Sequence, residues 1–265
     1  MTKYLSGALL AGFILIAGCS QDQDKQQPIK VGTIAGPETA LMEVAKKVAK
    51  EQYGLDINIV EFSDYATPNT ALNDGSIDAN AIQTLTYFEA TLAAKGYQLT
   101  PIGVTFIYPM GIYSSKIDDL SELADNTTVV IPNDPSNEER ALLLLQKAGL
   151  ITLDEIANGY TALRNIADNP KRLRLRALDS AQLPRALADV DIAVINTNYA
   201  VPAGLSPTKD ALFTEGEDSS YVNIIAVRTE DKDNEALQQL VKSYQSQAVV
   251  DEAEKLFNGT AIPAW

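Results

Sequence analysis

The sequence contains no histidine and a single cysteine, Cys19. Histidine is the commonest general base, the commonest zinc ligand and the usual charge switch near neutral pH, so its absence removes those chemistries. One cysteine cannot close an intramolecular disulfide or build a Cys-based metal site. G-x-S-x-G, phosphate-binding glycine-loop and H-E-x-x-H motifs are also absent. We therefore expect no metal, no cofactor and no catalytic residue, although carboxylate or lysine chemistry stays open.

Basic residues are few relative to acidic ones. The chain has 21 Lys and Arg against 35 Asp and Glu, a formal net charge of −14. Such a surface is repelled by phosphate backbones and by anionic membranes, which argues against a nucleic-acid partner. An excess of acidic residues is also explained by solubility alone, and we adopt that explanation here.

The only long apolar run lies at the N-terminus. Lys3 precedes an apolar stretch over residues 5–17, too short for a permanent membrane span but typical of a signal-peptide core. It ends in Ile16-Ala17-Gly18-Cys19, the pattern of a bacterial lipobox. The alternative is an ordinary signal peptide with an incidental cysteine. The pattern predicts a signal peptide over residues 1–18 and lipidation of Cys19.

Lipidation determines where the body resides. Two or more acyl chains hold a protein stably at a membrane, since each buried methylene contributes about 0.8 kcal/mol. Residues 19–28 are polar and aperiodic, which predicts a flexible tether. We expect an exported body in the periplasm or on the cell surface. Ser20 leaves open which membrane holds it.

From residue 29 onward, strand and helix patterns alternate. Strands are expected over 29–34, 55–62, 77–82, 128–131, 173–178, 190–195 and 221–227. Helices are expected over about 38–53, 67–73, 83–95, 136–148, 234–245 and 249–257. This alternation predicts an α/β fold with parallel sheets covered by helices on both faces. A crossing near 106–113 and a return near 224–228 predict two lobes: 29–108 with 225–265, and 109–224.

Polar and aromatic residues follow several of these strands, where open α/β sheets bind their ligands. The segments are 64–69, 78–83, 132–140, 195–199 and 221–223. In the third, Asp134 or Ser136 can cap a helix, and Glu139 can complete a capping box with Ser136. Arg140, one turn into that helix, suits a bidentate clamp on a carboxylate.

Each of these residues also has a plain structural interpretation. Arg140 can be a solvated helix residue or a partner of Glu138. Asn196 and Asn223 can be turn formers. Tyr65 and Tyr87 can be core aromatics with a solvated hydroxyl. The residues alone therefore predict a two-lobed binder of a small polar molecule and leave the molecule open.

Several segments resemble the methionine-binding lipoprotein family, also called the NlpA lipoprotein family, the solute-binding components of methionine ABC importers. The resemblance covers nearly the whole chain after the signal peptide and is most specific at Pro132–Arg140 and Val194–Ala200. The matching segments are 30–32, 53–56, 78–81, 132–140, 142–149, 182–185, 194–200, 221–223 and 257–265. It implies a two-lobed periplasmic-binding-protein fold of the type II kind, with the ligand cleft between the lobes.

The resemblance also implies partners and roles. An amino acid such as L-methionine would be the ligand, and an ABC permease in the inner membrane would receive it. Arg140 would hold the α-carboxylate, with Asn196 and Asn223 binding the carboxylate and ammonium. Tyr65 and Tyr87 would wall the thioether. Gln83 and Asn137, in the same segments, complete the expected site.

One segment departs from the family pattern. Where the family has Phe-Gln-His-Lys-Pro-Tyr, this chain has Ile82-Gln83-Thr84-Leu85-Thr86-Tyr87. Amino-acid binding is therefore expected, with the side chain of the ligand open between methionine, its D-enantiomer, another apolar amino acid and a short peptide. Two alternatives of other classes are an enzyme using Glu38 or Asp64, and a surface lipoprotein that no longer transports.

Overall fold

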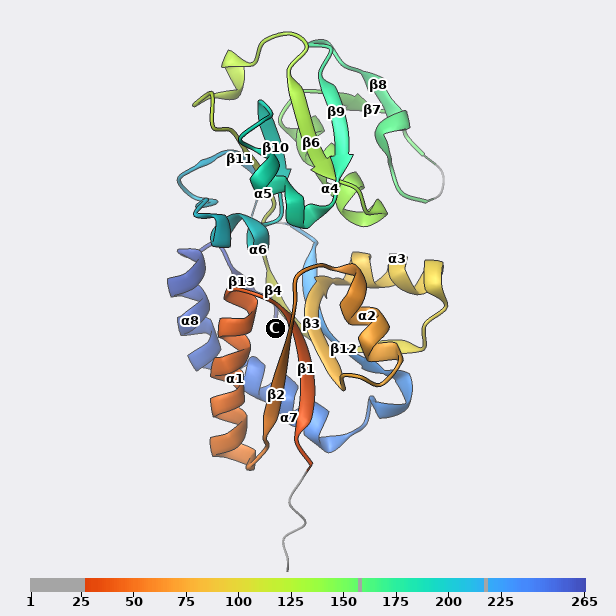
Figure 1. The fold of residues 1–265 in the computed structure, drawn as a ribbon, viewed down its shortest axis with the longest axis vertical. Helices are drawn as coiled ribbons and strands as arrows, with labels where there is room; N and C mark the ends of the chain where they lie inside the picture. Colours follow the sequence, from red (N-terminus) through yellow and green to blue (C-terminus); the bar gives the residue numbers. More distant parts are fainter. Residues whose placement is uncertain (1–26, 157–158, 217–218) are drawn as a thin grey trace, which may run out of the picture.

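The computed structural model describes residues 27–156, 159–216 and 219–265. The predicted signal peptide, Cys19 and all of the predicted tether except residues 27 and 28 lie outside the described residues. Figure 1 shows the described chain as two lobes, each built around its own β-sheet.

The larger lobe holds a six-stranded mixed sheet in the spatial order β13–β4–β12–β3–β1–β2. Strands β2, β1 and β3 run parallel, whereas β12 is antiparallel to both β3 and β4. The predicted parallel sheet is therefore right for β2, β1 and β3 and wrong for β12, β4 and β13, which pair antiparallel. The strands are β1 (Ile29–Ile34), β2 (Ile57–Phe62), β3 (Ala79–Thr84), β4 (Leu99–Ile107), β12 (Val222–Arg228) and β13 (Ile262–Pro263).

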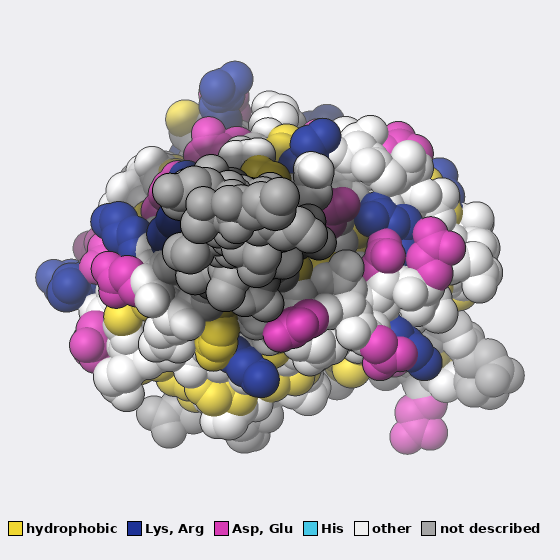
Figure 2. Space-filling view, turned by 90° about the horizontal axis from the view of Figure 1, so that it is seen from below, with side chains coloured by type: hydrophobic (Ala, Val, Ile, Leu, Met, Phe, Trp, Pro, Cys, Tyr) yellow, Lys and Arg dark blue, Asp and Glu magenta, His cyan; other side chains and the backbone are white. Residues whose placement is uncertain are grey.

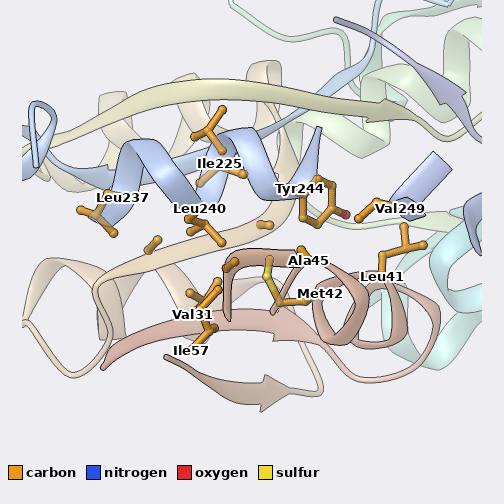
Figure 3. Packing of buried hydrophobic residues seen from close by; sticks show 14 of the residues in the cluster. Val31, Leu41, Met42, Ala45, Ile57, Ile225, Leu237, Leu240, Tyr244 and Val249 are labelled. Atoms are coloured by element: carbon orange, nitrogen blue, oxygen red, sulfur yellow. The ribbon is translucent and has the colours of Figure 1, made fainter. Parts of the chain in front are cut away.

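Helices cover both faces of this sheet. Helices α1 (Pro37–Tyr53), α7 (Glu235–Tyr244) and α8 (Gln247–Phe257) lie on one face, and α2 (Ala66–Asn73) and α3 (Leu85–Lys95) on the other. In α1, Leu41, Met42 and Ala45 recur at helical spacing and are fully buried against α7 and the sheet (Figure 3). The helix ends at Gly54, whose φ of 70° carries no Cβ penalty.

The smaller lobe holds a five-stranded sheet in the order β11–β5–β10–β6–β9. Helix α4 (Pro135–Lys147) packs on one face through Leu142 and Leu145, and α5 (Leu183–Ala186) on the other through Leu183. The short α6 (Thr197–Ala200) follows β10. The strands are β5 (Gly111–Tyr113), β6 (Thr128–Pro132), β9 (Arg174–Leu178), β10 (Ile192–Ile195) and β11 (Ala211–Thr214), and β7 (Thr152–Leu153) pairs with β8 (Ile166–Asp168) beside them.

Two segments join the sheets. The chain leaves the larger sheet after β4 and enters the smaller one at β5, so the first crossing is residues 108–110. It returns between β11 and β12, through residues 215–221. The predicted lobe boundaries fall within a few residues of these crossings and remain predictions.

Strand β4 was not expected from the sequence. It contains Pro101 and Gly103, which interrupt a strand pattern. In the fold, a Cβ on Gly103 would lie 2.6 Å from Cγ1 of Val241, so the glycine lets α7 approach the sheet closely. Pairing with β12 and β13 on its two sides stabilises the strand despite these residues.

The surface shows no concentration of one charge on the face drawn in Figure 2. Lys and Arg side chains alternate there with Asp and Glu around the grey atoms. Within the described ranges, no helix combines the length and apolar character that a membrane span requires. The same ranges contain no group of three or more Cys, Asp or Glu side chains placed to bind a metal ion.

Candidate functional site

A cavity lies between the lobes, with about 370 Å³ of space outside the protein atoms, a volume that includes some open solvent. All seven predicted ligand-binding residues line it, and both lobes contribute. The lining consists of Glu38, Tyr65, Ile82, Gln83, Thr84, Tyr87, Tyr108, Asn137, Arg140, Asn196, Thr197, Asn198 and Asn223. The structure thus brings the seven side chains together, while their roles toward a ligand remain predictions.

The carboxyl ends of parallel strands explain this convergence. Glu38 opens the helix after β1, Asn137 and Arg140 lie in the first turns after β6, and Asn196 follows β10 directly. Such ends meet at one edge of a sheet, so residues distant in sequence become neighbours. The two sheets present these edges to each other across the cavity.

Arg140 is buried, with a relative exposure of 3%, and its guanidinium is already hydrogen-bonded. Nε donates to Oε1 of Glu215 at 2.7 Å, and Nη2 donates to Oε2 of Glu215 at 2.5 Å. Nη2 also donates to the carbonyl oxygen of Tyr108 at 2.9 Å, and the guanidinium carbon lies 4.3 Å from the ring centroid of Tyr221. The bidentate edge predicted for a ligand carboxylate is therefore occupied by Glu215.

The α4 N-terminus fixes the orientation of two amides. Asp134 is the N-cap, accepting from the Asn137 backbone N–H at 2.9 Å, and it also accepts from Asn137 Nδ2. A carboxylate only accepts, so Asn137 must turn Oδ1 outward, where Asn196 Nδ2 donates to it at 2.8 Å. Asn196 Oδ1 is then buried with no partner among the described residues. It is an open acceptor in the cavity.

The alternative capping box at this helix does not form. Ser136 Oγ donates across the cleft to Thr86, and Glu139 accepts from the backbone N–H of Thr161. Glu138, the alternative partner of Arg140, accepts from the backbone N–H of Leu163. Both carboxylates of this helix thus accept hydrogen bonds from backbone N–H groups of the segment that follows it.

Aromatic rings form one wall. Tyr65 lies between Tyr87 and Tyr199, with ring centroids 5.7 and 5.0 Å away. Its hydroxyl donates to Asn198 Oδ1 at 2.6 Å, which leaves Asn198 Nδ2 buried without a partner in the described part of the chain. Burial raises the pKa of Tyr65 well above its ordinary value, so this hydroxyl stays protonated and can donate.

Gln83 and Asn223 differ in how their amides are used. Gln83 accepts from Asn69 at 2.6 Å and donates to both Asn69 and Asn80, so its amide is satisfied within a buried cluster. Gln83 therefore lines the cavity, but its amide oxygen and both amide hydrogens are already used in these bonds. The amide of Asn223 forms no hydrogen bond with residues 27–156, 159–216 or 219–265 and is available to a ligand.

Six residues of the lining were not predicted to bind a ligand, among them Glu38 and Asn198. Glu38 is 5% exposed and its Oε2 has no hydrogen-bond partner among the described residues. Burial raises the pKa of its carboxyl well above 4.5, as expected for a carboxylate without a counter-ion. Its position just after a strand was a usable signal, as was the place of Asn198 in the segment containing Asn196. Asp64, by contrast, accepts from the backbone N–H groups of Ala66 and Thr67 at the start of α2 and does not line the cavity.

Direct contacts join the lobes around the cavity. Besides the Tyr65–Asn198 bond, Tyr160 donates to the carbonyl oxygen of Thr86 at 3.3 Å, and Tyr199 to that of Ser63 at 3.4 Å. Thr197 Oγ1 donates to the carbonyl oxygen of Pro109 on the first crossing. These bonds hold the lobes against each other and enclose the cavity.

Comparison with known proteins gives consistent relatives. Residues 29–265 match the family model described as NlpA lipoprotein. A Salmonella typhi protein named D-methionine-binding lipoprotein MetQ is 48% identical over 98% of this chain and 96% of its own length. A nutrient binding protein from Burkholderia cenocepacia, solved bound to methionine, is 47% identical with a TM-score of 0.88, covering 89% of this chain and all of that one. A periplasmic substrate-binding protein of an ABC transporter from Coxiella burnetii is 56% identical with a TM-score of 0.86 over 89% of this chain and all of that one.

Proposed function

The chain belongs to the NlpA lipoprotein family, and from this premise we propose that it is the lipid-anchored solute-binding protein of an ABC importer. It captures methionine, or an amino acid of similar size, between its lobes and delivers it to a membrane permease. The observation that carries this proposal is the arrangement of hydrogen-bond donors and acceptors in the cavity that have no partner among the described residues.

Those atoms match an amino-acid zwitterion. Glu38 Oε2 and Asn196 Oδ1 are open acceptors, suited to an ammonium group. Asn198 Nδ2 is an open donor, and Arg140 Nη1 has no partner among the described residues, so both suit a carboxylate. Buried polar atoms without partners are rare in native proteins, and several in one cavity indicate a ligand that satisfies them.

The rest of the cavity suits an apolar side chain. Ile82 and the rings of Tyr65 and Tyr87 line it, and sulfur beside aromatic rings is favourable. Burying a methionine side chain contributes about 1.5–3 kcal/mol. Hydrogen bonds to charged groups contribute about 1.5–3 kcal/mol each, so three of them with the side chain support micromolar or tighter binding.

Methionine is favoured by two of the relatives, one named for D-methionine and the other solved with methionine bound. The altered segment from Ile82 to Tyr87 lies on this wall, so the ligand side chain is the least constrained part of the proposal. Titration calorimetry with both enantiomers of methionine, the other amino acids and a Gly-Met dipeptide tests it. Binding of none below millimolar concentration, by a protein purified without bound ligand, contradicts the function.

Binding rather than turnover follows from the side chains present. Arg140, Asn196, Asn198 and Asn223 can bind the charged groups of a ligand and are not nucleophiles. The threonine and tyrosine hydroxyls of the lining have no histidine to activate them, because the sequence contains none. Native mass spectrometry of the purified protein should show an intact amino acid. Release of an altered product would instead support the enzyme alternative.

Cys19 ties the protein to the membrane that its partner permease requires. Cys19→Ser removes the acyl acceptor, so we expect the protein to move from the membrane fraction to the soluble fraction of exported proteins. Ligand affinity of the variant should be unchanged, because the residues that line the cavity fall between Glu38 and Asn223 in the sequence. Persistence in the membrane fraction would contradict lipidation at this residue.

A further inference from the structure

Arg140 is bonded to both segments that join the lobes. Nη2 donates to the Tyr108 carbonyl oxygen on the first crossing, while Nε and Nη2 donate to Glu215 on the second. Oε2 of Glu215 in turn accepts from the backbone N–H of Met110 at 2.9 Å. The guanidinium and the Glu215 carboxylate therefore link the two crossings to the wall of the cavity.

These bonds leave one part of the guanidinium open. Arg has five N–H donors, one on Nε and two on each terminal nitrogen. The three bonds to Glu215 and Tyr108 use Nε and both hydrogens of Nη2, and the ring of Tyr221 covers one face. Among the nitrogens of this guanidinium, Nη1 alone has no hydrogen-bond partner in the described part of the chain, so its hydrogens are available to a ligand.

We propose that Glu215 is a positioning residue whose carboxylate holds the Arg140 guanidinium with Nη1 directed to the carboxylate of the ligand. The inference rests on the proposed function, since it assigns a role within the same site. It differs from the simpler idea that a carboxylate from the protein merely occupies Arg140 until a ligand displaces it.

The surroundings of Glu215 favour positioning over displacement. Its side chain is 10% exposed, and besides Arg140 it accepts from Met110 N and from Ser219 Oγ at 3.2 Å. A ligand that displaced it from Arg140 would leave a buried carboxylate without its counter-ion, which is strongly unfavourable. A ligand that binds Nη1 leaves the whole arrangement intact.

Removing the charge of Glu215 has two opposing effects. It relieves repulsion between Glu215 and the ligand carboxylate, which favours binding. It also loosens the guanidinium, because the amide of Glu215→Gln keeps a single acceptor oxygen and in either orientation turns its NH2 group toward a donor of Arg140. We expect the second effect to dominate, since an Arg that has turned away no longer contacts the ligand.

Calorimetry on the mature, full-length protein separates these effects. The probes are L-methionine and L-methioninamide, which keeps the amine but lacks the carboxylate. For Glu215→Gln we expect affinity for methionine to fall about 30-fold or more, the size seen when a buried charge pair loses a partner, with little change for methioninamide. Glu215→Asp, which keeps the charge, should recover part of the loss.

Asp56→Asn is the matched control. It removes one acidic charge and one ion pair, with Lys50 at 2.9 Å, where both side chains are more than half exposed. Its affinities for both probes should equal those of the wild type.

Three results would overturn the inference. Tighter methionine binding by Glu215→Gln would show that Glu215 competes with the ligand. An equal loss for both probes would show a general structural role. Unchanged affinity of Glu215→Gln for methionine would show that Glu215 has no role in ligand binding. A wild-type protein that binds neither probe would instead contradict the proposed function itself.

Discussion

The hydroxyl of Tyr65 in the larger lobe donates a 2.6 Å hydrogen bond to Oδ1 of Asn198 in the smaller lobe. Both residues line the cavity, so one bond joins the lobes and also leaves Nδ2 of Asn198 buried without a partner among the described residues. We therefore expect closure and ligand recognition to be coupled at this pair.

Tyr65→Phe should weaken methionine binding. The variant keeps the ring and loses the bond, and it leaves Asn198 Oδ1 buried without a donor, a cost of about 1–3 kcal/mol. We expect the dissociation constant measured by calorimetry to rise about 5- to 100-fold. Tyr97→Phe is the control, because its hydroxyl bonds Thr70 within the larger lobe. Equal effects of the two substitutions would contradict the coupling.

Glu38 should make the stability of the ligand-free protein depend on pH. Burial raises the pKa of this carboxyl above its ordinary 4.5, so the folded state holds the proton more tightly than the unfolded state. Its contribution to stability is fully present below 4.5 and is lost as the pH rises through the folded-state pKa. Glu38→Gln removes that loss.

Denaturant unfolding of wild type and Glu38→Gln, without ligand, tests this. We expect the variant to gain free energy of unfolding relative to wild type as the pH rises from 4.5 to 8, and to bind methionine more weakly because the ammonium loses a charged acceptor. A stability difference that is independent of pH would rule out titration of Glu38 as its cause.

Asp134→Ala should reduce both stability and affinity. Loss of an N-cap lowers the free energy of unfolding by about 0.5–2 kcal/mol. Asp134 also orients Asn137, which holds Asn196, so its removal frees an amide that lines the cavity. Asp119→Ala is the matched control, since Asp119 caps an exposed turn by accepting from Ser121 N. Urea unfolding should show a loss of stability for both variants. Calorimetry should show weaker methionine binding for Asp134→Ala alone.

The sequence predicted which residues line the cavity better than it predicted which charged residues pair with each other. Asn196 and Arg140 could be placed because each follows a strand, and strand ends converge on one edge of a sheet. Asn198 lies two residues after Asn196, and residue type alone does not distinguish which of two nearby asparagines lines a cavity. In the structure both do.

Glu215 carried no sequence signal. It lies in an irregular segment, 75 residues from Arg140 along the chain, and the pair forms only because the second crossing passes beside α4. Strand β4 was missed for a related reason: Pro101 and Gly103 disfavour a strand locally, and pairing with β12 overrides them. Long-range contacts decide both cases.

The two asparagines provide the sharpest test of the proposed polarity. Asn198→Asp keeps an acceptor for Tyr65 but replaces the open Nδ2 donor with a second oxygen, which in the proposed arrangement would face the ligand carboxylate. Asn196→Asp keeps the open acceptor and adds negative charge beside the ammonium, although it loses the donor to Asn137. The same chemical change thus meets opposite charges of one ligand.

We expect Asn198→Asp to weaken methionine binding by about 100-fold or more, since like charges in a desolvated site cost several kcal/mol. Asn196→Asp should lose markedly less, because attraction to the ammonium offsets the lost bond to Asn137. Calorimetry on both variants, with methioninamide as a second ligand, tests the assignment. Methioninamide lacks the repelled carboxylate, so Asn198→Asp should bind it with a smaller loss than it shows for methionine. If Asn196→Asp lost more affinity for methionine than Asn198→Asp, the ligand would bind in the opposite orientation to the one proposed.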